Sequence, residues 1–162
     1  MSAIDHLLHA NEKYVATFPG PRPLRPKLRL AIIACMDSRL DLFGALGLEI
    51  GDAHLMRNAG GLPTDEMLRS LALSQRSLGT REVVLIHHTE CGMQGFDDAA
   101  FRRQLEAESG EKPTWDVPGI TDLHATMRDS LLRVRECKWI PHRDDVRGFI
   151  FDIGTAHLDE VV

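Results

Sequence analysis

The chain has few of the features that mark membrane-spanning, secreted or disulfide-bonded proteins. Its 162 residues contain no apolar run close to the roughly 18 residues that a membrane span requires. The first residues also lack the charged and then apolar order of a signal peptide. Only three cysteines are present, and an odd number does not suit a disulfide framework. We therefore expect a cytoplasmic protein with no membrane partner.

The sequence also lacks a concentrated run of basic residues. The formal net charge is -5, and lysine and arginine are scattered among acidic residues rather than interleaved with aromatic ones. This pattern argues against a nucleic-acid partner. Hydrophobic residues make up 43% of the chain and charged residues 27%, which is ordinary for a globular protein. The length suits one domain, which we expect to span residues 1–162.

The N-terminal part is predicted to be a helix on an extended arm. Residues 2–16 have helical spacing of apolar side chains, with Ser2 as a candidate N-cap. Four prolines within residues 19–26 exclude helix and central strand, so this segment should run extended. We divide the chain into an arm, residues 1–27, and a core, residues 28–162. A helix held away from the core suggests a partner subunit that receives it.

The rest of the chain alternates strand-like and helix-like segments. This alternation predicts an α/β domain with a mainly parallel four-stranded sheet in the order 2-1-3-4, flanked by helices, and the last segment can add a fifth, antiparallel edge strand. The predicted helices are 40–48, 65–78, 97–108 and 120–136, and the predicted strands are 30–34, 53–57, 82–87, 147–153 and 157–161.

Two short motifs follow the first and third of these strands. Residues 35–39 read Cys-Met-Asp-Ser-Arg, and residues 88–91 read His-Thr-Glu-Cys. Ligands in open α/β sheets bind beyond the carboxyl ends of the strands, so side chains from both motifs should converge there. Two thiolates and one imidazole suit Zn²⁺, and three protein ligands leave the fourth position that catalytic sites keep open. We predict one zinc ion per chain, bound by Cys35, His88 and Cys91.

An acidic and a basic residue stand beside the predicted ligands. Two thiolates neutralise Zn²⁺ and should leave it a weaker Lewis acid than a zinc held by three histidines. Asp37 could compensate by accepting a hydrogen bond from zinc hydroxide and orienting it. Arg39 could hold Asp37 in a bidentate pair and keep the carboxylate off the metal. Asp37 and Arg39 are therefore the candidate catalytic residues, and a simple loop salt bridge is the alternative.

With these motifs the chain resembles the β-class carbonic anhydrases, which carry Cys-x-Asp-x-Arg and a later His-x-x-Cys. The resemblance extends through residues 57–61, covers residues 28–96 well, and is to the compact subgroup of the family. It implies reversible hydration of carbon dioxide to bicarbonate and a proton by zinc-bound hydroxide, assisted by the Asp37–Arg39 dyad. It also implies a homodimer or larger homo-oligomer in which the N-terminal helix clasps a partner.

Two other functions remain open from the sequence. Relatives on the same scaffold hydrolyse carbonyl sulfide or carbon disulfide, linear molecules that the same hydroxide could attack. A non-catalytic zinc protein, with the metal sealed by Asp37 or Cys137, is the second alternative. A cysteine phosphatase conflicts with the spacing, because Cys35 and Arg39 are only four residues apart.

Two further histidines are predicted to lie outside the metal site. His87 should face away from His88, because side chains alternate along a strand, and we interpret it as a packed residue. His54 has a side chain suited to proton transfer, although an ordinary strand histidine is the simpler interpretation.

Overall fold

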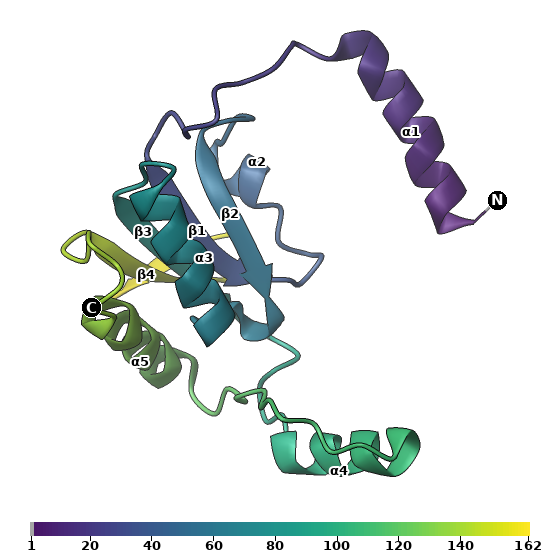
Figure 1. The fold of residues 1–162 in the computed structure, drawn as a ribbon, viewed down its shortest axis with the longest axis vertical. Coiled ribbons are helices and arrows are strands. Elements are labelled where there is room, and N and C mark those ends of the chain that lie inside the picture. Colours follow the sequence, from purple (N-terminus) through teal and green to yellow (C-terminus); the bar gives the residue numbers. More distant parts are fainter. Residues whose placement is uncertain (1) are drawn as a thin grey trace.

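The computed structural model describes residues 2–162 and contains one five-stranded sheet in the order β2-β1-β3-β4-β5 (Figure 1). The first four strands are parallel, and β5 pairs antiparallel with β4. The predicted strand order and the antiparallel edge strand are confirmed. The strands are β1 Leu30–Cys35, β2 Ala53–Asn58, β3 Glu82–His88, β4 Val146–Phe151 and β5 Leu158–Val161. The helices are α1 Ala3–Thr17, α2 Leu42–Leu46, α3 Asp65–Arg76, α4 Asp98–Ser109 and α5 Leu123–Glu136, with a 3₁₀ turn at Ala59–Gly61.

The core lies on both faces of the sheet because its central strands are apolar on both faces. Residues 31–34 of β1 are fully buried, as expected for a parallel strand covered on both sides. On one face α3 and α5 pack against the sheet through side chains such as Leu71 and Met127. On the other face Leu42 of α2 and Ile120 belong to a second cluster. The central strands therefore form a rigid base for the residues that follow them.

Several predicted helix boundaries differ from the structure. Helix α2 is two residues shorter than predicted at each end, and α1 and α4 are each shifted by one residue. Helix α5 begins at Leu123, three residues later than predicted, because Asp122 caps it by accepting a hydrogen bond from the backbone N–H of Ala125. Ile120 instead pairs with Gln94 in an isolated β-bridge and is fully buried. Helix α3 ends at Arg76, two residues earlier than predicted.

Helix α1 stands apart from the body of the molecule at the end of the extended arm (Figure 1). Ser2 and Asp5 form a capping box at its start, so its local sequence stabilises it. None of its residues is buried. Helix α4 also projects from the body. Within residues 2–162, no helix is long and apolar enough to cross a membrane. The division into arm and core stays a prediction.

Candidate metal centre

Neighbouring strands bring the three predicted metal ligands to one end of the sheet. Cys35 is the last residue of β1, and His88 is the last residue of β3, which pairs parallel with β1. Cys91 follows in a turn in which Glu90 adopts a left-handed backbone conformation with φ 53°. The Sγ atoms of Cys35 and Cys91 are 3.9 Å apart, and the ligand atoms of all three residues lie within 4.8 Å of one another. All three residues are buried.

The geometry and the donor atoms fit a zinc ion. Tetrahedral zinc with Zn–S bonds of about 2.3 Å places two sulfurs about 3.8 Å apart, close to the observed spacing. The Nε2 atom of His88 is buried and has no hydrogen-bond partner, which is costly unless a ligand occupies it. The Nδ1 atom of His88 lies 2.8 Å from the carbonyl oxygen of Thr89 and can donate to it. When Nδ1 donates this bond, Nε2 carries no proton and its lone pair is free to bind a metal. This is the usual arrangement for a metal-binding histidine.

The predicted dyad lies beside these ligands, and its two members hold each other. Arg39 donates from Nε to Oδ1 of Asp37 at 3.0 Å, from Nη2 to Oδ2 at 2.7 Å, and from its backbone N–H to Oδ1 at 2.9 Å. Its Nη2 also donates to the carbonyl oxygen of Glu90 at 2.9 Å and so ties the two motifs together. Oδ2 of Asp37 is 3.7 Å from Nε2 of His88. The carboxylate is next to the metal position and is held by the guanidinium.

The hydrogen bonds at the site also set its charges. The pKa of the Asp37 carboxyl lies well below its usual range, because the side-chain and backbone hydrogen bonds from Arg39 stabilise the ionised form. Burial opposes ionisation of the Cys35 thiol, but the neighbouring His88 imidazole and the backbone N–H of Asp37 stabilise the thiolate and lower the pKa of Cys35 to about 7. Burial raises the pKa of the Cys91 thiol. Cys35 is therefore the thiol that ionises first.

Arg57, near the end of β2, holds the backbone of the first motif. It donates from Nε to the carbonyl oxygen of Cys35 at 2.8 Å and from Nη2 to that of Asp37 at 2.6 Å. A longer contact of 3.4 Å joins Nη1 to the carbonyl oxygen of Leu40. Sequence reasoning assigned Arg57 no role of its own, because its partners are main-chain atoms about 20 residues away that no side-chain pattern marks.

The turn after β2 packs directly on the strands that carry the ligands. Gly61 has φ +66°, and a Cβ atom there would lie 2.7 Å from the backbone nitrogen of Cys35 and 2.8 Å from the carbonyl oxygen of Ile86. Asn58 closes the turn by accepting from the N–H of Leu62 at 2.9 Å and donating to its carbonyl oxygen at 2.8 Å. Only glycine suits this close approach with a positive φ.

The other residues that the sequence raised lie outside the metal centre. His87 is fully buried, and burial lowers its pKa to about 4, as suits a packed neutral imidazole. Nδ1 of His54 lies 2.7 Å from Oγ of Ser74, which ties this histidine to α3. Cys137 caps the C-terminus of α5 and packs against the core on that side. Among the described residues, the potential metal-binding group does not include Cys137.

Comparisons with known proteins agree with this geometry. Residues 30–130 match the carbonic anhydrase family model. The chain is 45% identical over 161 residues to beta-carbonic anhydrase 1 of Mycobacterium tuberculosis, covering 99% of each chain. It is 34% identical over 150 residues to a carbon disulfide hydrolase of Acidithiobacillus thiooxidans, covering 80% of this chain and 75% of that protein. The crystal structure of a carbonic anhydrase from Streptococcus mutans superposes with a TM-score of 0.91 at 41% identity, covering 100% of this chain and 99% of that one.

Proposed function

Because the chain belongs to the β class of the carbonic anhydrase family, we propose that it reversibly hydrates carbon dioxide to bicarbonate and a proton at a zinc ion. Cys35, His88 and Cys91 are the proposed zinc ligands. The observation that carries the proposal is a set of three buried donor atoms within 4.8 Å of one another, with the Asp37–Arg39 pair beside them. A structural site closed by a fourth protein ligand lacks support, because Asp37 is engaged by Arg39 and Cys137 lies elsewhere in the fold.

The three ligands have distinct tasks in this proposal. When bound, zinc supplies a Lewis acid that lowers the pKa of a coordinated water. The thiolates of Cys35 and Cys91 balance the charge of the ion, while Nε2 of His88 completes the protein's share of the coordination. The bond from His88 to the carbonyl oxygen of Thr89 orients the imidazole ring.

Asp37 is the proposed acceptor for the reacting water. Its low pKa means that the carboxyl is ionised throughout the neutral range, so it accepts a hydrogen bond and does not store the proton. Accepting that bond directs a lone pair of the water oxygen toward the carbon of carbon dioxide, to which the new C–O bond forms. The proton released in the reaction must leave to solvent or buffer. Arg39 keeps the carboxylate in this position through two parallel hydrogen bonds.

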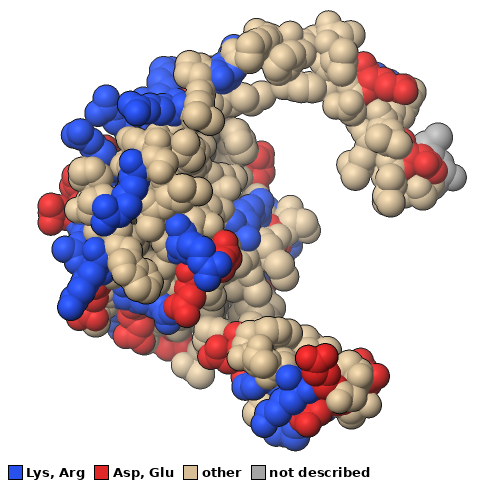
Figure 2. Space-filling view, in the orientation of Figure 1, with Lys and Arg blue, Asp and Glu red and all other residues tan. Residues whose placement is uncertain are grey.

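We further propose that the protein is a homodimer or larger homo-oligomer and that α1 packs on a second copy. Ile4, Leu7, Leu8 and Val15 lie on one side of α1 and are 69%, 66%, 62% and 66% exposed. An apolar stripe of this size is costly in water and is typical of a subunit contact. Figure 2 shows that α1 and its arm curve away from the body and leave a wide hollow opposite α4.

Carbon disulfide hydrolysis is the second candidate activity. The 34% identity to a carbon disulfide hydrolase favours it, since both substrates are linear molecules open to attack at the central carbon. The carbonic anhydrases that match nearly the whole chain do so at 45% and 41% identity, which places carbon dioxide first. Stopped-flow rates with carbon dioxide, carbonyl sulfide and carbon disulfide on one preparation will rank the three substrates.

The test of the function pairs turnover with metal analysis. We expect one zinc per chain and rapid carbon dioxide hydration in stopped-flow assays. Cys91→Ser should lose both zinc and activity, because it removes a proposed ligand. Cys137→Ser, the matched thiol change, should retain both. A chain with full zinc occupancy that accelerates neither carbon dioxide hydration nor the hydrolysis of carbonyl sulfide or carbon disulfide would leave only the non-catalytic zinc protein.

A further inference from the structure

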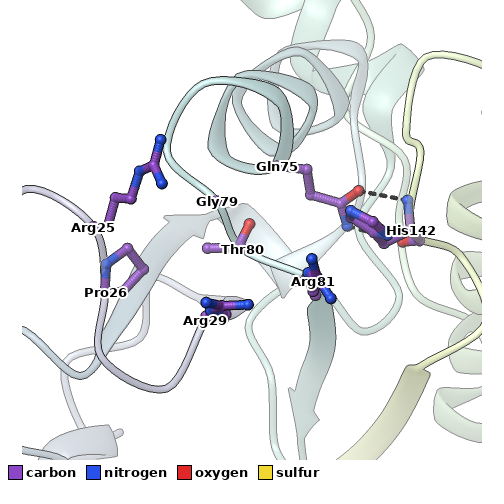
Figure 3. Close-up of a pocket in the computed structure, with 8 residues that line it drawn as sticks. All are labelled: Arg25, Pro26, Arg29, Gln75, Gly79, Thr80, Arg81 and His142. Atoms are coloured by element: carbon purple, nitrogen blue, oxygen red, sulfur yellow. Dashed lines mark hydrogen bonds between the residues drawn. The ribbon is translucent and has the colours of Figure 1, made fainter.

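A cavity lies at the end of the sheet opposite the metal centre. Its volume is about 430 Å³, and it opens beside the residues that precede β1 and β3 (Figure 3). Cys35 lies at the other end of β1, roughly 20 Å away along a six-residue strand. A ligand in this cavity would not touch the metal centre. The side chains that matter for its chemistry are Arg25, Arg29, Gln75, Thr80, Arg81 and His142.

Three arginines line this cavity without an acidic partner, two from the segment before β1 and one from the segment before β3. Among residues 2–162, Arg25, Arg29 and Arg81 have no carboxylate oxygen within 4.0 Å. Other arginines of the chain do hold acids, such as Arg39 with Asp37 and Arg147 with Glu160. Guanidinium groups are always charged, so three of them around one opening repel one another unless an anion lies between them.

The figures show how these cations gather. In Figure 3 Arg29 and Arg81 lie near each other below Thr80, Arg25 lies to the left of Gly79, and His142 lies on the right. In Figure 2 basic side chains cluster on the body where the arm joins it. Because the chain as a whole carries a net charge of -5, this local concentration of positive charge is not a consequence of overall composition.

The backbone holds the walls of the cavity in place. Arg29 has φ 54°, a left-handed conformation that non-glycine residues seldom adopt. Its carbonyl oxygen accepts from the N–H groups of Arg81 at 2.7 Å and Glu82 at 3.3 Å, so the two arginines are fixed side by side. On the opposite wall, buried Gln75 exchanges hydrogen bonds of 2.9 and 2.8 Å with the backbone of His142. These hydrogen bonds fix the backbone from which the exposed arginine side chains extend, so binding a ligand does not need to order the backbone.

We propose that this cavity binds an anion with two or more phosphoryl groups, with Arg29 and Arg81 as the central contacts and Arg25 at the rim. Guanidinium groups match phosphate oxygens in bidentate geometry. Three permanent positive charges suit an anion of more than one negative charge, and the cavity is larger than a single phosphate needs. Inorganic pyrophosphate and nucleoside di- or triphosphates share this chemistry. The proposal concerns a separate site and does not depend on the activity of the metal centre.

Calorimetric titration of the zinc-loaded full chain tests the proposal. The probes are orthophosphate, pyrophosphate and ATP at one fixed ionic strength. We expect one saturable site per chain, with pyrophosphate binding about tenfold or more tightly than orthophosphate, because it meets more of the guanidinium groups. Tighter binding of ATP than of pyrophosphate would identify a nucleotide as the ligand, and equal binding would identify the diphosphate group itself.

Matched charge changes separate this site from general anion binding. The double variant Arg29→Gln/Arg81→Gln should weaken pyrophosphate binding about tenfold or more, and Arg81→Gln alone should show a smaller loss in the same direction. Arg103→Gln/Arg128→Gln removes the same charge from exposed positions outside the cavity and should leave binding unchanged. Carbon dioxide hydration without added anion should be the same in all of these variants. The proposal is overturned if no saturable binding occurs at millimolar pyrophosphate, or if both double variants weaken binding equally.

Discussion

Asp37, a proposed catalytic residue, lies where its position would decide whether the proposed metal site is open or is closed by a fourth protein ligand. Its Oδ2 atom lies 3.7 Å from the proposed ligand atom of His88, so a small rotation could bring the carboxylate onto a metal. Three hydrogen bonds from Arg39 oppose that rotation. The structure therefore has the arrangement in which a fourth coordination position stays available.

Asp37→Asn should retain zinc and lose about a hundredfold in carbon dioxide hydration, because an amide keeps the shape of the carboxylate but not its charge. Stopped-flow rates measured with parallel zinc analysis will check this. Asp116→Asn changes an exposed acid elsewhere and is the control. Normal turnover in Asp37→Asn would remove this residue from the mechanism.

Arg57→Lys should lower both turnover and stability, because an ammonium group cannot reach the separate carbonyl oxygens that the guanidinium holds. We expect a loss of about 2 kcal/mol in the free energy of unfolding, measured by urea titration of the zinc-loaded chain. Arg128→Lys, an exposed change on α5, should have no effect. Equal turnover and equal stability of the two variants would show that Arg57 does not hold the backbone of residues 35–39 in place.

These two cases show how far sequence reasoning reached at the level of single residues. Asp37 and Arg39 could be predicted because they share one short motif with a ligand, and the structure brings them together. Arg57 could not, because it acts on backbone carbonyls of a neighbouring strand end. The partners of such a residue become visible only when the register of Ala34 with Arg57 is known.

Among the structural elements, the 3₁₀ turn at Ala59–Gly61 most directly supports the metal centre. It lies against β1 and β3 at the point where both strands end. Gly61→Ala should destabilise the zinc-loaded chain by about 3 kcal/mol or more, because the new Cβ would clash with the backbone of Cys35 and Ile86. Thermal or urea unfolding measures the loss, and zinc content should fall with it.

Gly47→Ala separates the clash from the backbone strain. Gly47 also has a positive φ of +62°, but a Cβ there would meet nothing within 4 Å. This variant should lose only about 1 kcal/mol, the cost of placing alanine in a left-handed conformation. If both variants lose the same free energy of unfolding, the turn does not pack closely enough on β1 and β3 for a Cβ atom at residue 61 to clash.

The strands were predicted more accurately than the helix ends. Buried parallel strands carry continuous apolar runs, and every predicted strand lies within two residues of the observed bounds. The start of α5 was wrong because Ile120 continues the helical spacing of apolar residues. Its burial comes instead from the loop near Gln94, a tertiary contact that no local pattern reveals.

For the whole molecule, buried His87 predicts a loss of stability in acid. Its pKa is about 4 in the folded chain, against an ordinary value of 6.5, because burial disfavours the charged imidazole. Between these two values the unfolded chain binds more protons, so the free energy of unfolding falls as the pH decreases from about 6.5 to about 4. The full effect is about 3 kcal/mol.

Urea unfolding at several pH values checks this effect. Other groups also titrate in this range, including the proposed zinc ligands, so His87→Gln is the comparison that isolates the contribution of His87. The variant should lose less stability between pH 6.5 and 4 than the parent chain does. Parallel pH curves for the two proteins would contradict the prediction, whatever their absolute stabilities.

The proposed assembly through α1 predicts a concentration-dependent oligomer. Ile4→Ser/Leu8→Ser should weaken self-association at least about tenfold, because each change removes apolar surface that a partner would bury. Sedimentation velocity over a range of protein concentrations measures the shift. Lys13→Ser alters the same helix at an exposed polar position and is the control. Unchanged association in the double variant would place the subunit contact elsewhere.

The separation of the ligands along the chain has a consequence for biosynthesis. Cys35 and Cys91 are 56 positions apart, and their strands become neighbours only after β3 has been translated and has joined β1. A nascent polypeptide that has been translated only as far as β2 therefore contains Cys35 but neither of the other two proposed ligands. The proposed ion could be captured only once the middle of the sheet has assembled, so metal loading would follow the pairing of β1 with β3.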